Sequence, residues 1–156
     1  MAASHHVMHS HIQFYKSKVQ FRFSNKTAII NWIGQVIRKE CKKTGSINFI
    51  FCTDDFLLSI NKQYLKHDFY TDIITFNYSE GKLINGEIYI SIDRVRENAA
   101  SLGFKFPVEL SRIVIHGVLH LLGYSDNTPS QKKLMSKKED ACLSLLLTKR
   151  QVVKSK

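Results

Sequence analysis

His116-Gly117-Val118-Leu119-His120-Leu121-Leu122-Gly123-Tyr124-Ser125-Asp126 is the stretch of this chain that says most about its fold and its chemistry. It continues an apolar run at 113–115, so we expect a helix that is apolar nearly all round and therefore central and buried. His116 and His120 are four residues apart, which on a helix places both imidazoles on one face, one turn apart. Gly123 can end or bend that helix, and Asp126 follows where the returning chain can bring its carboxylate to the same point.

These three side chains predict a metal site. Two imidazoles and one carboxylate form a three-ligand set with an open position for water, the usual form of a catalytic zinc site. We therefore predict that His116, His120 and Asp126 bind one divalent metal ion, with Zn²⁺ as the expected metal. The alternatives are that the histidines are buried core or capping residues, which need hydrogen-bond partners, and that Asp126 only caps the turn.

The same offsets match the metzincin motif H-E-x-x-H-x-x-G-x-x-H. Gly117 stands where those proteases carry the glutamate that acts as general base. Peptide hydrolysis by that mechanism is therefore not supported, and a minimal metalloprotease is the weakest of the functional interpretations.

Length and composition predict one soluble domain. The chain has 156 residues, of which 44% are hydrophobic, and no apolar run approaches the roughly 20 residues of a membrane span. Its first residues lack the long apolar core of a signal peptide. Cys41, Cys52 and Cys142 are isolated, which argues for a reducing compartment. We expect a cytoplasmic protein without a membrane partner.

The charge is strongly basic. Lys and Arg number 23 against 13 Asp and Glu, which gives a formal net charge of +10. An excess of this size favours a polyanionic partner, and nucleic acid is the first candidate. The alternative is a basic surface that is merely solvated.

Apolar periodicity and turn residues predict an α+β fold, a small mixed β-sheet packed by about five helices with the metal site on the central buried helix. The expected elements are a strand or hairpin at 12–23, helices at 26–43, 53–64, 93–102, 107–122 and 129–147, and strands at 47–52, 72–76 and 87–92. Val19, Phe21 and Phe23 alternate as in a strand, and Asn25 is the expected N-cap of the first helix. On the last helix the residues expected to face inward are Leu134, Cys142, Leu143 and Leu146. We expect a flexible extension at 1–11, a single domain at 12–148 and a basic tail at 149–156.

Three blocks of the sequence together resemble one family. The run from His116 to Asp126 resembles the H-G-x-L-H-L-x-G-Y-D-H signature of the YbeY family of metal-dependent endoribonucleases. Asn61-x-x-Tyr64 followed by residues 71–76 resembles its N-x-x-Y-R…T-D-V-L-S-F segment, and residues 86–90 resemble its G-D-I-x-I strand. The resemblance covers roughly residues 12–146. It implies cleavage of single-stranded rRNA in the maturation of the 3′ end of 16S rRNA and in ribosome quality control, with rRNA and the small subunit or its assembly factors as partners.

Two positions depart from the family pattern. The third ligand is usually histidine, and here it is Asp126, which is also a sound zinc ligand. Leu65 stands where the family commonly carries an arginine, so the neighbouring Lys66 or Arg112, four residues before His116, is the expected cation for the phosphate.

The hypothesis is metal-assisted phosphodiester hydrolysis, with His116, Lys66 and Arg112 as the candidate catalytic residues. Asp72 is a further acidic residue near the site in the family pattern, and we expect it to order its strand rather than to act as the base. The alternative function is a non-catalytic RNA-binding or ribosome assembly factor whose metal is structural and closed by a fourth protein ligand. For Arg112 the alternative is a surface salt bridge.

Overall fold

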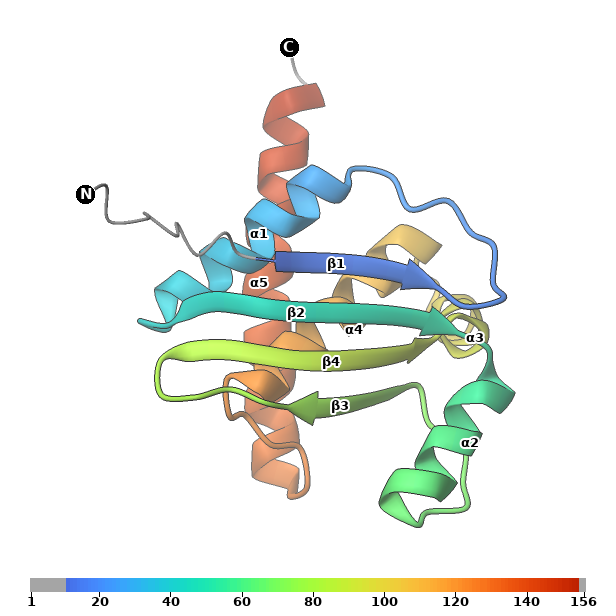
Figure 1. The fold of residues 1–156 in the computed structure, drawn as a ribbon. Coiled ribbons are helices and arrows are strands. Elements are labelled where there is room, and N and C mark those ends of the chain that lie inside the picture. The colour runs from blue at the N-terminus through green and yellow to red at the C-terminus, as the bar shows by residue number, and fades with distance from the viewer. Residues whose placement is uncertain (1–10, 155–156) are drawn as a thin grey trace, which may run out of the picture.

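The structure, a computed structural model, describes the backbone of residues 11–154 and the side chains of residues 11–146. Four strands form one mixed sheet in the order β1-β2-β4-β3, and five helices pack around it (Figure 1). The elements are β1 His11–Lys16, α1 Lys26–Lys39, β2 Lys43–Cys52, α2 Asp54–Leu65, β3 Ile73–Asn77, β4 Leu83–Ser91, α3 Ile92–Leu102, α4 Phe106–Leu121 and α5 Pro129–Lys154. The expected α+β class, with a small mixed sheet and five helices, is confirmed.

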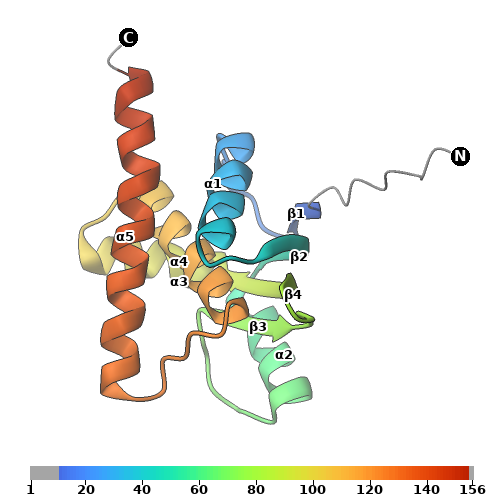
Figure 2. The ribbon, with the colours of Figure 1, turned by 90° about the vertical axis from the view of Figure 1, so that its left-hand side faces the viewer.

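The sheet has two different faces because successive side chains of a strand point to opposite sides. β1 and β4 both run parallel to β2, and β3 runs antiparallel to β4 at the edge. One face carries Phe49, Phe51 and Ile88, which are fully buried in the main core. Figure 2 shows α1, α4 and α5 together on this side of the sheet.

The helix α4 is the centre of the main core, as its sequence predicts. Buried residues occur on every side of it, among them Ile113, Ile115, Val118 and Leu119. Pro107 lies in its first turn, where a missing N–H costs nothing. This burial holds the two histidines of the same helix in a rigid frame.

The opposite face of the sheet is covered in part by α2. Thr53 caps this helix by accepting a hydrogen bond from the N–H of Phe56 at 3.1 Å. Leu57 and Ile60 pack with Ile74 of β3 in a second, smaller apolar cluster. The cap and the cluster fix the position of the segment that follows α2 and leads into β3.

Several expectations about local structure were wrong. Val19, Phe21 and Phe23 form no strand, because Lys18 has a φ of +56° and turns the chain away from the sheet edge. The phenylalanines still pack inward, with the Phe21 ring 5.0 Å from that of Phe51. Asn25 is left-handed and makes no side-chain cap.

The ends of the elements also differ from the expected ones. α1 ends at Lys39 rather than at 43, because Cys41 is left-handed with a φ of +59°. β2 and β4 both begin earlier than expected, since Lys43 pairs with Leu83. On α5, Cys142, Leu143 and Leu146 are buried as expected, but Leu134 is 47% exposed and Met135 takes the inward position.

α5 continues to Lys154, so the backbone of the expected basic tail is helical at 149–154. The predicted extension at 1–11 lies outside the described residues, apart from His11, which begins β1. Within the described part of the chain, no helix is long and apolar enough to cross a membrane.

Candidate metal site

The site begins with the orientation of α4. Gly117 faces the sheet, where a Cβ atom on it would lie 2.8 Å from Ile88 Cγ2 and 3.1 Å from Ile73 Cδ1. His116 therefore points sideways from the sheet, and His120 lies one turn further along the same side. About a fifth of each histidine side chain is exposed, at 20% and 22%.

The third predicted residue reaches the same point. The Nε2 atoms of His116 and His120 are 3.0 Å apart, and Asp126 Oδ2 lies 3.3 Å and 3.4 Å from them. Ligand atoms about 2.0–2.1 Å from a tetrahedral metal lie roughly 3.3 Å from one another. The three atoms thus have the separations that one small divalent ion requires. The structure brings together the residues that the sequence pattern singled out as metal ligands.

The Nδ1 atom of each imidazole already has a hydrogen-bond partner. His120 Nδ1 lies 3.0 Å from the carbonyl oxygen of Tyr124, which can only accept, so His120 carries its proton on Nδ1. His116 Nδ1 lies 2.7 Å from Glu139 Oε2, a carboxylate oxygen that accepts in the same way. In the neutral rings both Nε2 lone pairs then face the Asp126 carboxylate with no proton between them. Three lone pairs directed at one point fit a cation.

Glu139 on α5 is the residue that the sequence analysis missed. It is buried, and while one oxygen holds His116, the other lies 3.5 Å from a guanidinium nitrogen of Arg112. Arg112 also lies near Glu109 and Asp140, at 3.5 Å and 3.8 Å. Arg112 is therefore paired with carboxylates, one of which, Glu139, also contacts His116.

The pKa values of the two histidines shift in opposite directions. Burial lowers the pKa of His116, but the hydrogen bond and charge of Glu139, with smaller effects of Asp126 and Asp72, raise it above its usual value. Burial and the charge of His116 lower the pKa of His120. His120 is thus held in the neutral form that a metal ligand requires.

The loop that carries Asp126 is anchored to α1 and α5. Gly123 has a φ of +102°, a conformation that favours glycine, and it lets the chain turn back after α4. The hydroxyl of Tyr124 donates to Glu40 Oε1 at 2.7 Å, and the Lys138 amine donates to the same oxygen at 3.3 Å. These contacts hold the carbonyl that orients His120 and place Asp126 two residues further on.

The remaining candidates lie around this group. Lys66 is the left-handed residue that ends α2; it is exposed, and no ion pair or side-chain hydrogen bond is found for it among the described side chains. Asp72 orders the start of β3, since its carbonyl accepts from the Ser91 N–H at 3.0 Å. Burial raises the pKa of its carboxyl, against the opposing effect of the His116 charge.

Comparison of the sequence with known proteins finds the same family that the motif at 116–126 indicated. The sequence model of the family described as Endoribonuclease YbeY matches residues 11–146. The chain belongs to the YbeY family. A relative named Endoribonuclease YbeY from Flavobacterium psychrophilum is 50% identical over 132 residues, which is 85% of this chain and 94% of the relative. One from Parabacteroides distasonis, with the same name, is 44% identical over 135 residues, or 86% and 95% of the two chains.

A solved structure shares this fold. The solution structure of TM1509 from Thermotoga maritima matches with a TM-score of 0.62 at 25% identity, over 90% of this chain and 92% of that one. Asp126 stands where the YbeY pattern usually has the third histidine. Its carboxylate lies close to both imidazoles, so it occupies the position of the third ligand. Leu65, where the family commonly carries arginine, ends α2 and is 41% exposed.

Proposed function

We propose that this protein is a metal-dependent endoribonuclease that hydrolyses phosphodiester bonds in single-stranded RNA at the His116, His120 and Asp126 group. The observation that carries the proposal is the convergence of two Nε2 atoms and one carboxylate oxygen, with both Nδ1 atoms held by acceptors. Membership of the YbeY family, whose relatives bear the name Endoribonuclease YbeY, supplies the reaction class.

Each residue has a separate part in this proposal. A divalent ion, when bound, polarises a phosphoryl oxygen and lowers the pKa of a water molecule. His116, His120 and Asp126 hold it, with Zn²⁺ as the expected ion because two imidazoles and a carboxylate suit zinc. Glu139 holds the proton on His116 Nδ1 and fixes the ring, and Arg112 keeps Glu139 in place. Lys66 is the cation left to contact a phosphate of the RNA.

The number of ligands favours catalysis over a purely structural metal. Among the described side chains, no fourth His, Cys, Asp or Glu joins the group, and all three ligands are partly exposed. A structural zinc site is closed by four protein ligands, whereas a catalytic one keeps a position for water. A protease of the H-E-x-x-H type is disfavoured because Gly117 faces the sheet and has no space for a glutamate.

The substrate and the setting follow from the family and the charge. We propose rRNA as the substrate, in maturation of the 3′ end of 16S rRNA and in ribosome quality control, with the small subunit or its assembly factors as partners. The net charge of +10 supports binding to a polyanion. The cytoplasmic location stays a prediction of the sequence.

Removal of the metal tests this proposal. We expect the purified protein to contain about one divalent ion per chain and to cleave single-stranded RNA. Dialysis against a chelator is expected to abolish cleavage, and addition of Zn²⁺ to restore it, with metal content followed by elemental analysis. Cleavage that persists in protein shown to be free of metal would contradict the proposal.

The role of Glu139 gives a second prediction. Glu139→Gln keeps the shape of the side chain but removes the charge that orients and polarises His116. We expect metal affinity to fall about 10- to 100-fold, as for other partners of metal-bound histidines, in a competition titration with a chromophoric chelator. Asp140→Asn is the matched control, because Asp140 is exposed and lies near Arg112 without contacting His116. Equal affinities of the two variants would disprove the role.

A further inference from the structure

The segment from the end of α2 to the start of β3 exposes several aromatic rings. Tyr64 is 59% exposed, Phe69 56% and Tyr70 48%, and His67 is exposed between them. We call Tyr64, His67, Phe69 and Tyr70 the aromatic platform. Large apolar side chains gathered on a surface usually mark a binding site.

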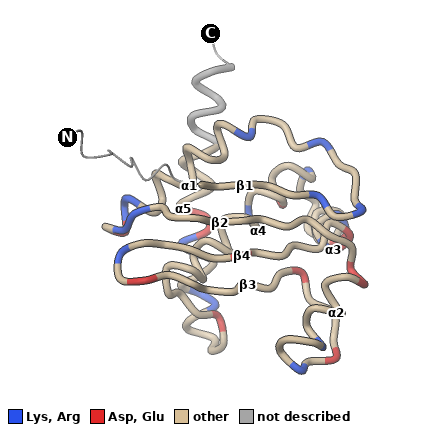
Figure 3. The backbone as a smooth tube through the Cα atoms, viewed as in Figure 1, with Lys and Arg blue, Asp and Glu red and all other residues tan. Residues whose placement is uncertain are grey.

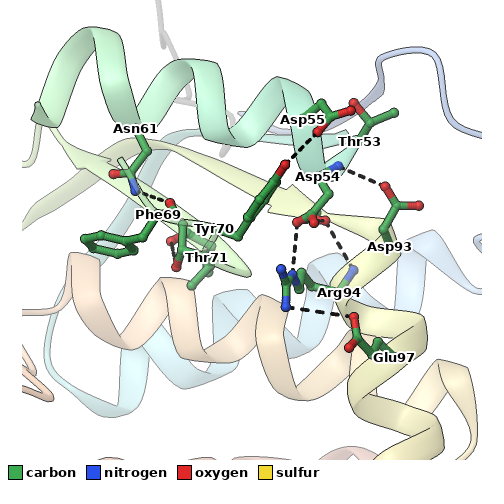
Figure 4. Close-up of polar contacts among 12 residues, drawn as sticks. Thr53, Asp54, Asp55, Asn61, Phe69, Tyr70, Thr71, Asp93, Arg94 and Glu97 are labelled. Carbon is green, nitrogen blue, oxygen red and sulfur yellow. Dashed lines mark hydrogen bonds and ion pairs between the residues drawn. The ribbon is translucent and has the colours of Figure 1, made fainter. Parts of the chain in front are cut away.

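The structure holds the platform in place from behind. The buried side chain of Asn61, only 2% exposed, donates through Nδ2 to the carbonyl of Phe69 at 2.9 Å, and the Tyr70 hydroxyl donates to Asp55 at 3.1 Å (Figure 4). Arg94 lies over one face of the Tyr70 ring, 5.3 Å from its centre, and is itself bonded to Asp54 at 3.1 Å. Figure 4 shows Tyr70 directed toward Asp55 and Phe69 directed away from it.

Two of the rings are already stacked on each other. The ring centres of His67 and Phe69 are 5.1 Å apart, with an angle of 21° between the planes. Exposed flat rings that lie nearly parallel are a surface on which the bases of a single-stranded nucleic acid can stack.

One basic side chain beside the platform is available for a phosphate. Figure 3 shows basic and acidic residues together around the end of α2. Lys62 is paired with Asp68 at 3.3 Å, whereas no ion pair is found for Lys66 within residues 11–146. The amine of Lys66 can contact a phosphate of the RNA backbone, and the exposed rings beside it can contact the bases.

The platform leads directly into the metal site. Ile73, three residues after Tyr70, packs against α4 beside His116, since a Cβ atom on Gly117 would lie 3.1 Å from Ile73 Cδ1. The segment that carries the platform therefore continues into a strand that packs against the helix of His116 and His120.

We propose that the aromatic platform binds the bases of single-stranded RNA beside the bond that is cleaved, with Lys66 on the backbone. This inference rests on the proposed function. It explains the selection of single-stranded over double-stranded RNA by contacts of the bases with the aromatic platform. In a duplex the bases are stacked on one another and cannot reach these rings.

Binding measured without cleavage tests the platform separately from the enzyme. The probe is a fluorescein-labelled oligouridine of about twelve nucleotides, titrated by anisotropy in excess chelator so that no RNA is cut. We expect Phe69→Ala and Tyr64→Ala each to weaken binding about tenfold, and both to leave the affinity for a duplex RNA of the same length within about twofold. Lys66→Ala is expected to reduce the slope of log affinity against log salt by about 0.7, which the aromatic variants leave unchanged.

The matched control is Tyr15→Ala. Tyr15 is 49% exposed on β1, at the opposite edge of the sheet from β3, and is expected to leave binding unchanged. Wild-type affinity of folded Phe69→Ala and Tyr64→Ala overturns the proposal and leaves the rings as a surface for a protein partner. An equal loss in Tyr15→Ala overturns it too. A wild-type protein that contains metal and binds the oligouridine but does not cleave it would count against the proposed function and not against the platform.

Discussion

His120→Ala is expected to lose both the metal and the RNA-cleaving activity. His120 supplies one of three converging ligand atoms, and its lowered pKa keeps that atom unprotonated. Loss of a partner that only orients a ligand costs about 10- to 100-fold in affinity, so loss of the ligand itself is expected to cost more than about 100-fold. Elemental analysis after dialysis and cleavage of a labelled single-stranded RNA measure the two effects.

The control for this variant has to account for other histidines. His9 and His11 lie at the start of the chain and are themselves capable of binding stray metal. His9→Ala combined with His11→Ala is expected to keep the bound metal and full cleavage. Metal that remains in His120→Ala at wild-type stoichiometry, or cleavage that remains without metal, would contradict the assignment of the site.

Gly117→Glu is expected to prevent folding rather than to create a protease. The substitution completes the H-E-x-x-H spacing, but a Cβ at 117 already lies 2.8 Å from Ile88, and a carboxylate there is buried against the apolar face of the sheet. An unpaired buried charge together with this overlap is expected to cost more than about 5 kcal/mol, which is comparable to the whole stability of a small domain.

Gly117→Ala separates the effect of space from that of charge. The added methyl group forces Ile88 and Ile73 to shift, while alanine favours the helix, so a net loss of only about 1 kcal/mol is expected. Thermal unfolding followed by circular dichroism compares the two variants. A Gly117→Glu protein that unfolds at the wild-type temperature would show that this position does not face the sheet as described.

Patterns that are local in sequence predicted the centre of the site. The apolar run around His116 specifies a buried helix, and the spacing of His120 and Gly123 specifies one face and a turn. Asp126 is close enough in sequence that the turn alone brings it back. These relations depend on helical geometry and hardly on the rest of the fold.

Relations between distant segments were harder to predict. Val19, Phe21 and Phe23 alternate because one side faces the core, but alternation alone does not supply a neighbouring strand to pair with. Glu139 was missed for a similar reason, since its partner lies on another helix. It left one signal in the sequence: it shares a helical face with the buried Met135 and Cys142, and a carboxylate in such a stripe needs a partner.

The dependence of His116 on Glu139 also has a consequence for the order in which the site is made. The two residues are separated by 23 positions in the chain, so His116, His120 and Asp126 are all synthesised before the carboxylate that orients the first of them. We therefore expect RNA cleavage of the proposed kind to be weaker in a chain whose C-terminal helix has not yet packed against α4, because His116 then lacks the carboxylate that orients its ring.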